Sequence, residues 1–171
     1  MWRRSRPDEH ELIAELSLKL FEEDPSPKPP PAKADVLALL SWLVREPVRG
    51  LSVVLDVGAE IRGYGLLISF LSNELKGEVC VLDEIYVIRA ERGRGRGTEL
   101  IEAIARGDEP WGRPPVAVEL EVSPDNRSAR ALYERLGFAP LRNAMMRRMR
   151  SEGELRAMSE RPFDKLDRKV L

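Results

Sequence analysis

The stretch VCVLDEIYVIRAERGRGRGTELIEAIA, residues 79–105, decides the fold of this chain. Its first part is rich in valine and isoleucine, which is typical of a buried β-strand. Its last part carries Leu100, Ile101 and Ile104 at helical spacing. A glycine-rich turn, Arg92–Gly97, joins the two. The first N–H groups of a helix have no intrahelical partner, and the helix dipole makes them a site for a pyrophosphate. We therefore predict a phosphate-binding turn, with its arginines adding positive charge.

Other phosphate-binding sequences fit this turn poorly. No Gly-Lys-Ser/Thr follows it, so it is not a Walker loop. Its glycines, at 93, 95 and 97, do not have the dinucleotide-binding spacing, and the strand before it follows hairpins instead of opening a β-α-β unit. An arginine-glycine nucleic-acid tract would not be flanked by a strand and an apolar helix. A nucleic-acid module would show steep salt dependence of binding, and we expect no nucleic-acid partner.

The remaining elements are predicted from the periodicity of apolar residues and from the residues that interrupt it. In chain order we predict helices over 8–23 and 35–45, strands over 51–57, 61–71 and 78–88, a helix from the turn to 107, a strand over 116–122, a helix over 126–136 and a closing strand region over 138–149. Asp8 and Glu11 have the spacing of a capping box, and residues 25–31 form a proline-rich loop. This order predicts an α/β (α+β) fold, a mixed sheet with helices on both faces. Residues 1–150 form the domain and 151–171 a charged C-terminal extension.

Composition restricts the function. The chain has 171 residues, 43% of them apolar and 33% charged, with a net charge of −1, so we expect one globular domain without bulk attraction to nucleic acid or membrane. A single cysteine, Cys80, and a single histidine, His10, argue against a disulfide and against a metal site. The longest uncharged stretch, 63–73, is far shorter than the ~20 residues of a membrane span. We expect a cytoplasmic protein with no metal and no membrane partner.

Several segments, taken together and in this order, resemble the GNAT superfamily of N-acetyltransferases. They are Leu82–Val87, the Arg-x-x-Gly-x-Gly signature from Arg92 to Gly97, and the Asn-(x)6-Tyr-(x)3-Gly-Phe arrangement from Asn126 through Tyr133 to Phe138. The resemblance covers about residues 8–149. It departs from the family pattern at Arg96, where the family has a small aliphatic residue, and in the first strand, reduced here to Met1–Arg6 at most.

The resemblance implies a mostly antiparallel GNAT-like sheet that splays open between two central parallel strands, 78–88 and 116–122. Acetyl-CoA would bind in that gap. Its contacts would come from Ile85, Tyr86 and Val87 for pantetheine, from Arg92, Gly93, Arg94, Gly95, Arg96, Gly97 and Thr98 for the pyrophosphate, and from Asn126. The N–H of Val87 would polarise the thioester carbonyl as an oxyanion donor. Asn126 has an equally good reading as a helix cap.

The resemblance also implies an acid and a base. Tyr133 would protonate the departing thiolate as general acid, since a phenol is still protonated at neutral pH; the alternative is a tyrosine packed in the core. Asp83 or Glu84 would be the general base, and strand alternation places them on opposite faces. We slightly favour Glu84, with a surface carboxylate or an ion pair to an arginine as the alternative.

The acceptor is harder to read. Glu119 and Glu121 share one strand face and would either form an acidic wall or simply be solvated. With Glu84, these carboxylates favour a small cationic amine over a protein lysine or N-terminus. The expected enzyme is an acyltransferase in which the amine attacks acetyl-CoA directly, with CoA as product. A catalytically inactive acyl-CoA-binding sensor is the alternative. Because dimers are common in the family, we also expect a homodimer.

Overall fold

The computed structural model describes residues 1–25, 29–143 and 145–149. Its strands are β1 (Trp2–Arg4), β2 (Gly50–Val57), β3 (Glu60–Ser72), β4 (Gly77–Val87) and β5 (Ala117–Leu120). Its helices are α1 (His10–Glu23), α2 (Lys33–Arg45), α3 (Arg96–Arg106) and α4 (Arg127–Arg135), with short 3-10 turns η1 (Pro7–Glu9) and η2 (Arg89–Glu91). The strands form one sheet in the order β1-β2-β3-β4-β5, and β4–β5 is its parallel pair. The mixed α/β fold and most element positions are therefore confirmed.

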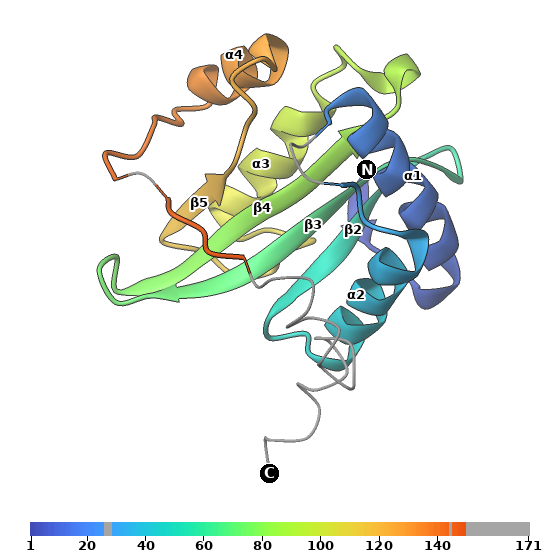
Figure 1. The fold of residues 1–171 in the computed structure, drawn as a ribbon, viewed down its shortest axis with the longest axis horizontal. Coiled ribbons are helices and arrows are strands. Elements are labelled where there is room, and N and C mark those ends of the chain that lie inside the picture. The colour runs from blue at the N-terminus through green and yellow to red at the C-terminus, as the bar shows by residue number, and fades with distance from the viewer. Residues whose placement is uncertain (26–28, 144, 150–171) are drawn as a thin grey trace.

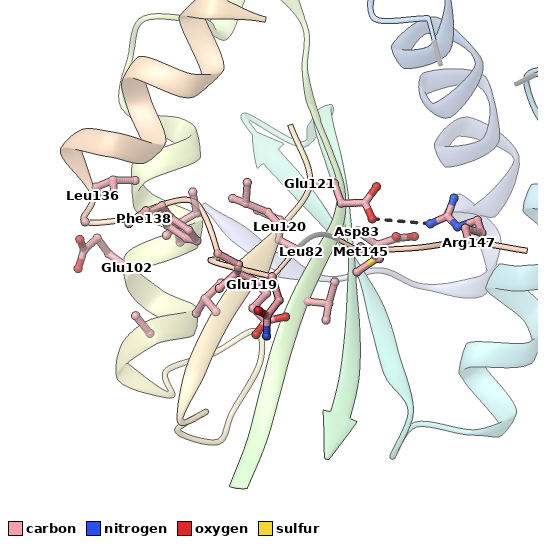
Figure 2. A pocket seen from close by; sticks show the side chains of 18 residues that line it. Leu82, Asp83, Glu102, Glu119, Leu120, Glu121, Leu136, Phe138, Met145 and Arg147 are labelled. Atoms are coloured by element: carbon pink, nitrogen blue, oxygen red, sulfur yellow. Dashed lines mark ion pairs between the residues drawn. The ribbon is translucent and has the colours of Figure 1, made fainter. Parts of the chain in front are cut away.

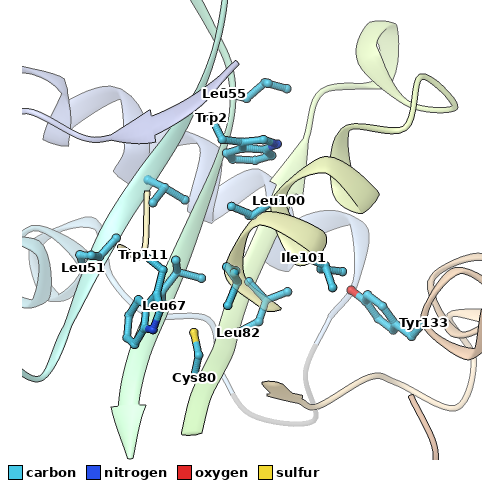
Figure 3. Close-up of a cluster of buried hydrophobic side chains, with 12 residues drawn as sticks. Trp2, Leu51, Leu55, Leu67, Cys80, Leu82, Leu100, Ile101, Trp111 and Tyr133 are labelled. Atoms are coloured by element: carbon cyan, nitrogen blue, oxygen red, sulfur yellow. The ribbon is translucent and has the colours of Figure 1, made fainter. Parts of the chain in front are cut away.

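The sheet lies between two helical layers (Figure 1). Because side chains alternate along a strand, neighbouring residues of β2 enter different cores: Val53 and Leu55 pack with α3, whereas Val54 packs with α1 and α2. Figure 3 shows the core on the α3 side, where Leu100 and Ile101 meet the sheet. Each face of the sheet thus has its own core, and α3 packs on one of them.

Two sequence predictions about chain segments are wrong. No strand forms over 138–143 and 145–149, the described part of the predicted closing strand, so β5 lies at the edge of the sheet and not in its centre. Asp8 does not cap α1, because the chain first makes the turn η1, in which the N–H of Arg6 donates to Glu9 Oε2 at 2.7 Å. The extension 151–171 and residues 26–28 of the proline-rich loop lie outside the described residues.

None of the described helices combines the length and the apolar character needed to cross a bilayer.

The start of the chain is fastened by a buried carboxylate. Glu9 is 6% exposed and accepts hydrogen bonds from two nitrogens of Arg3, at 2.7 and 3.0 Å. The bonds from Arg3 lower the pKa of Glu9 below its ordinary value. Glu9 thereby joins β1 to the start of α1. A carboxylate with a depressed folded-state pKa stabilises the fold above its unfolded pKa, and this stabilisation disappears as the pH falls through the folded value.

Replacing Glu9 with glutamine should lower the free energy of unfolding at pH 7 by roughly 1–3 kcal/mol, since hydrogen bonds to a charged group are lost in a buried place. Denaturant titration of both proteins would measure the difference, which should shrink as the pH is lowered through the depressed pKa. Glu11→Gln is the matched control, because Glu11 makes an exposed ion pair with Lys33. Equal losses for both variants would contradict the assignment.

Candidate functional site

The sheet opens between β4 and β5. Their pairing runs from Val79–Ala117 to Leu82–Leu120, and β4 then continues to Val87 without a described partner on that side. A cavity of about 910 Å³ occupies the opening. We call it the splay cavity, and its described walls include Ile85–Val87, most of the turn 91–98, and Ser123, Asp125, Asn126, Ser128, Ala129, Leu132 and Tyr133. A cavity of this size accommodates a small-molecule ligand.

Backbone groups of β4 face the splay cavity. The N–H of Ile88 donates to the carbonyl of Arg62 on the β3 side at 3.0 Å, so by the alternation of an antiparallel ladder the backbone of Tyr86 also faces β3. The N–H groups of Ile85 and Val87 therefore point the other way, into the opening. Ile85, Tyr86 and Val87, the three residues predicted to bind pantetheine, all line the cavity, and the first and last direct their N–H groups into it.

The turn after β4 has the backbone of an anion site. Gly93 and Gly95 have φ of 73° and 76°, in the left-handed region that favours glycine. A Cβ at either position would meet nothing within 4 Å, so the conformation, not crowding, requires glycine. Gly95 caps α3, which leaves the N–H groups of Arg96, Gly97 and Thr98 at the start of the helix directed toward the splay cavity.

The three arginines of the turn are all paired with glutamates. Arg92 Nη1 lies 2.8 Å from Glu23, and Arg94 and Arg96 lie 3.3 and 3.1 Å from the buried Glu91. Arg92 also donates to the carbonyl of Val87 at 2.7 Å. Arg92 and Arg96 line the splay cavity, whereas Arg94 is not among its described lining residues. Net positive charge at the turn is thus smaller than the sequence suggests, so an anion bound there would depend mainly on the backbone N–H groups.

Helix α4 forms the opposite wall. Asn126 Oδ1 accepts the N–H of Ala129 at 3.1 Å, which confirms the predicted cap. Tyr133, in the same helix, is 9% exposed and lines the cavity. Its ring centroid lies 5.7 Å from that of Phe138. No described residue hydrogen-bonds to its hydroxyl. Burial, and then the nearby Asp24 carboxylate, raise the pKa of Tyr133, so the phenol stays protonated well above neutral pH.

The neighbouring carboxylates Asp83 and Glu84 face different surroundings because β4 contains a bulge. Leu66 pairs with Glu84 and Leu67 with Leu82, so Asp83 is an extra residue without a partner in β3. Glu84 points toward α1, where its Oε2 accepts the hydroxyls of Tyr64 at 2.6 Å and Ser17 at 3.2 Å. Burial raises the pKa of Glu84. Glu84 is not among the described residues that line either cavity.

Asp83 lies in a second cavity, of about 950 Å³, which we call the edge cavity because it adjoins β5, the edge strand of the described sheet (Figure 2). The edge cavity also holds Glu102, Glu119 and Glu121, and Arg147 lies 3.6 Å from Glu121. The pKa of Asp83 is raised, first because the surrounding protein reduces its hydration and second because Glu121 lies near. The described part of the cavity is therefore rich in carboxylates.

Sequence reasoning missed Glu23 and Asp24, which line the splay cavity from the end of α1. The sequence carries one signal for them: acidic residues 22–24 end a helix whose last turn has no basic residue, against the preference set by the helix dipole. Among the described residues, no group of three or more His, Cys, Asp or Glu side chains is arranged to hold a metal ion.

The chain belongs to the acetyltransferase (GNAT) family, whose profile matches residues 11–138. An uncharacterized N-acetyltransferase of Methanocaldococcus jannaschii is 35% identical over 97 residues, 57% of this chain; the match spans only 42% of that relative's length. A possible acetyltransferase from Clostridium difficile 630 has the same fold, with a TM-score of 0.73 at 18% identity, over 89% of this chain and 98% of the other. A ribosomal-protein-alanine N-acetyltransferase from Brucella melitensis biovar Abortus 2308 gives a TM-score of 0.65 at 17% identity, over 87% and 99%.

Proposed function

We propose that the chain is an N-acetyltransferase that moves an acetyl group from acetyl-CoA to a primary amine by direct attack. One observation carries the proposal: the splay cavity has free N–H donors of β4 and of the start of α3 on one side and the buried hydroxyl of Tyr133 on the other. A thioester linked to a pyrophosphate needs that combination. Family membership supports acetyl transfer as the reaction class.

Two sets of backbone N–H groups, one in the strand and one in the turn, would bind acetyl-CoA. Ile85 and Val87 offer strand N–H groups to the amides of pantetheine. The turn residues Gly93–Thr98 offer their N–H groups to the pyrophosphate, helped by the dipole of α3. The side chains of Arg92 and Arg96 lie beside this place and add to its positive potential even while paired.

The reaction needs a donor hydrogen bond, an acid and a base. The amine nitrogen attacks the thioester carbon, and the developing oxyanion takes the N–H of Val87. The carbon–sulfur bond then breaks, and the Tyr133 hydroxyl gives its proton to the departing thiolate. Cys80 is fully buried, and burial raises the pKa of its thiol to about 12, which supports direct attack over an acyl-cysteine intermediate.

Asp83 is the better supported base. It lines the edge cavity, one residue beyond the last β4–β5 pair, and its raised pKa favours taking a proton from an ammonium group. Glu84, which the sequence slightly favours, is held by two hydroxyls on the α1 side. The carboxylates of the edge cavity support a small cationic amine as acceptor. Among them, Glu121 lies near enough to Asp83 to raise its pKa.

A protein N-terminus remains the alternative acceptor. The Brucella neighbour is named for a ribosomal-protein alanine, but at 17% identity the likeness concerns the fold alone. Acidic side chains would attract either kind of amine. Turnover of spermidine-like amines compared with short peptides, at equal acetyl-CoA, separates the two acceptor classes directly.

Calorimetric titration of the full chain with acetyl-CoA tests the proposal, with CoA and ATP as comparison ligands. We expect saturable binding of acetyl-CoA and CoA and little response to ATP. A folded protein that binds neither acetyl-CoA nor CoA would overturn the proposal. Binding without turnover of any amine in a broad screen would instead support an acyl-CoA-binding sensor.

A further inference from the structure

The C-terminal end of α1 is tied to the β4 wall of the splay cavity. Glu23 Oε1 accepts the Tyr86 hydroxyl at 2.8 Å, and Glu23 Oε2 accepts Arg92 Nη1 at 2.8 Å. The Arg92 guanidinium also lies 5.3 Å from the centre of the Tyr86 ring. One carboxylate thus joins α1 to the end of β4 and to the glycine-rich turn.

The residue that follows α1, its C-cap Asp24, is tied to the other wall. Asp24 Oδ2 accepts Asn126 Nδ2 at 2.7 Å, and the same Asn126 caps α4 with its other side-chain atom. Two consecutive carboxylates therefore reach the two sides of the cavity, 69 and 102 residues further along the chain. In Figure 1 the end of α1 lies where β4 leads toward α3 and the chain after β5 leads into α4.

Among the described residues, strand pairing does not hold the two walls of the splay cavity together. Strand pairing between β4 and β5 ends at Leu82–Leu120, before the cavity begins. A carboxylate at the C-terminal end of a helix opposes the helix dipole, so α1 alone gives no reason for Glu23 and Asp24. Charge-assisted hydrogen bonds are among the stronger ones in proteins. The hydrogen bonds of Glu23 and Asp24 to the two walls explain why these carboxylates stand at the end of α1.

We infer that Glu23 and Asp24 are positioning residues for the acyl-donor site: acting through Arg92 and Tyr86 on one side and through Asn126 on the other, they hold the two walls of the splay cavity at the separation that the CoA moiety needs. The identity of the ligand rests on the proposed function. A preformed cavity spares the ligand the free energy of ordering its walls, so loss of either tie should weaken binding.

An exchange of the Asp24–Asn126 pair tests this inference. Asn126→Asp keeps a good helix cap but sets two carboxylates against each other, and we expect the Kd for CoA, measured by calorimetry, to rise about tenfold, or ~1.4 kcal/mol. Asp24→Asn alone keeps an acceptor oxygen for Asn126 and should bind like the wild type. The double variant Asp24→Asn/Asn126→Asp restores a donor facing an acceptor and should return the Kd to within about twofold of the wild type, since the coupled pair is again complete.

The other tie is tested by Glu23→Ala, with Glu22→Ala as matched control, because Glu22 is exposed one residue earlier on the same helix. We expect a tenfold rise in the Kd for CoA for the first, little change for the second, and a smaller rise for Glu23→Gln, which keeps an acceptor. In an Arg92→Ala background, Glu23→Ala should add much less than it does alone.

The outcomes separate this inference from the proposed function. If the wild type does not bind CoA, the proposed function fails and takes the inference with it. If the wild type binds and Glu23→Ala binds equally well, the inference alone is wrong. If the double exchange binds as weakly as Asn126→Asp, Asn126 contacts the ligand itself and the positioning role of Asp24 is overturned. Melting temperatures of all variants, measured without ligand, show whether a weak binder is folded.

Discussion

Replacing Tyr133 with phenylalanine should lower kcat for acetyl transfer about a hundredfold, because general acid catalysis of this kind contributes roughly 10²–10⁴-fold. The ring would still pack against Phe138, so the Kd for CoA should stay within about twofold of the wild type. Because the pKa of Tyr133 is raised, the wild-type hydroxyl keeps its proton through neutral and mildly alkaline pH. Any loss of rate caused by ionisation of the Tyr133 hydroxyl should therefore occur at a pH above the ordinary pKa of a tyrosine.

The measurement is a steady-state rate with a saturating amine, paired with calorimetric binding of CoA. A matched control is Tyr64→Phe, which removes another buried hydroxyl but one bonded to Glu84 on the opposite face of the sheet. Full activity in Tyr133→Phe would show that the thiolate takes its proton from elsewhere and would make Tyr133 a core residue. A weakened Kd with an unchanged kcat would assign it to binding instead.

Replacing Asp83 with asparagine should reduce kcat/KM for the amine about a hundredfold at neutral pH, within the range for a lost general base. The carboxylate acts as a base only above its pKa, which is raised. The wild-type rate should thus rise with pH through this value, and the variant should lack that rise. The pH profile of kcat/KM, corrected for ionisation of the amine, measures both effects.

Glu84→Gln distinguishes the two adjacent carboxylates. The substitution keeps an acceptor for Tyr64 and Ser17, so we expect a modest loss compared with Asp83→Asn. Glu74→Gln, an exposed change in the turn between β3 and β4, controls for the loss of one negative charge. A larger loss in Glu84→Gln than in Asp83→Asn would reverse the assignment of the base to Asp83.

Local patterns predicted what depends on local physics. The strand-turn-helix unit around residues 79–105, the cap at Asn126 and the glycine that follows α4 were readable because capping, left-handed turns and apolar periodicity are properties of a few neighbouring residues. The resemblance to the family supplied the opening between β4 and β5, which no periodicity contains. Together they located the cavity that Tyr133 lines.

The rest depended on contacts distant in sequence. The pairing of Arg92 with Glu23 and of Asn126 with Asp24 joins residues on different elements, so the turn looked more strongly basic than it is. The bulge changed which carboxylate meets a cavity, since simple alternation assigns faces without allowing for an extra residue. The segment 138–149 was predicted as a strand from its place in the element order, but its described residues make no ladder with β5.

The bulge in β4 has a consequence for how this family member can vary. Leu82 faces the α3 core and Glu84 faces α1, which is the alternation that two consecutive residues of a regular strand would have. A chain that lacked position 83 could therefore keep every cross-strand neighbour and both cores. Asp83 is an addition to a strand that is already complete. Selection or a protein engineer can therefore replace Asp83 while the strand pairing of the sheet stays the same.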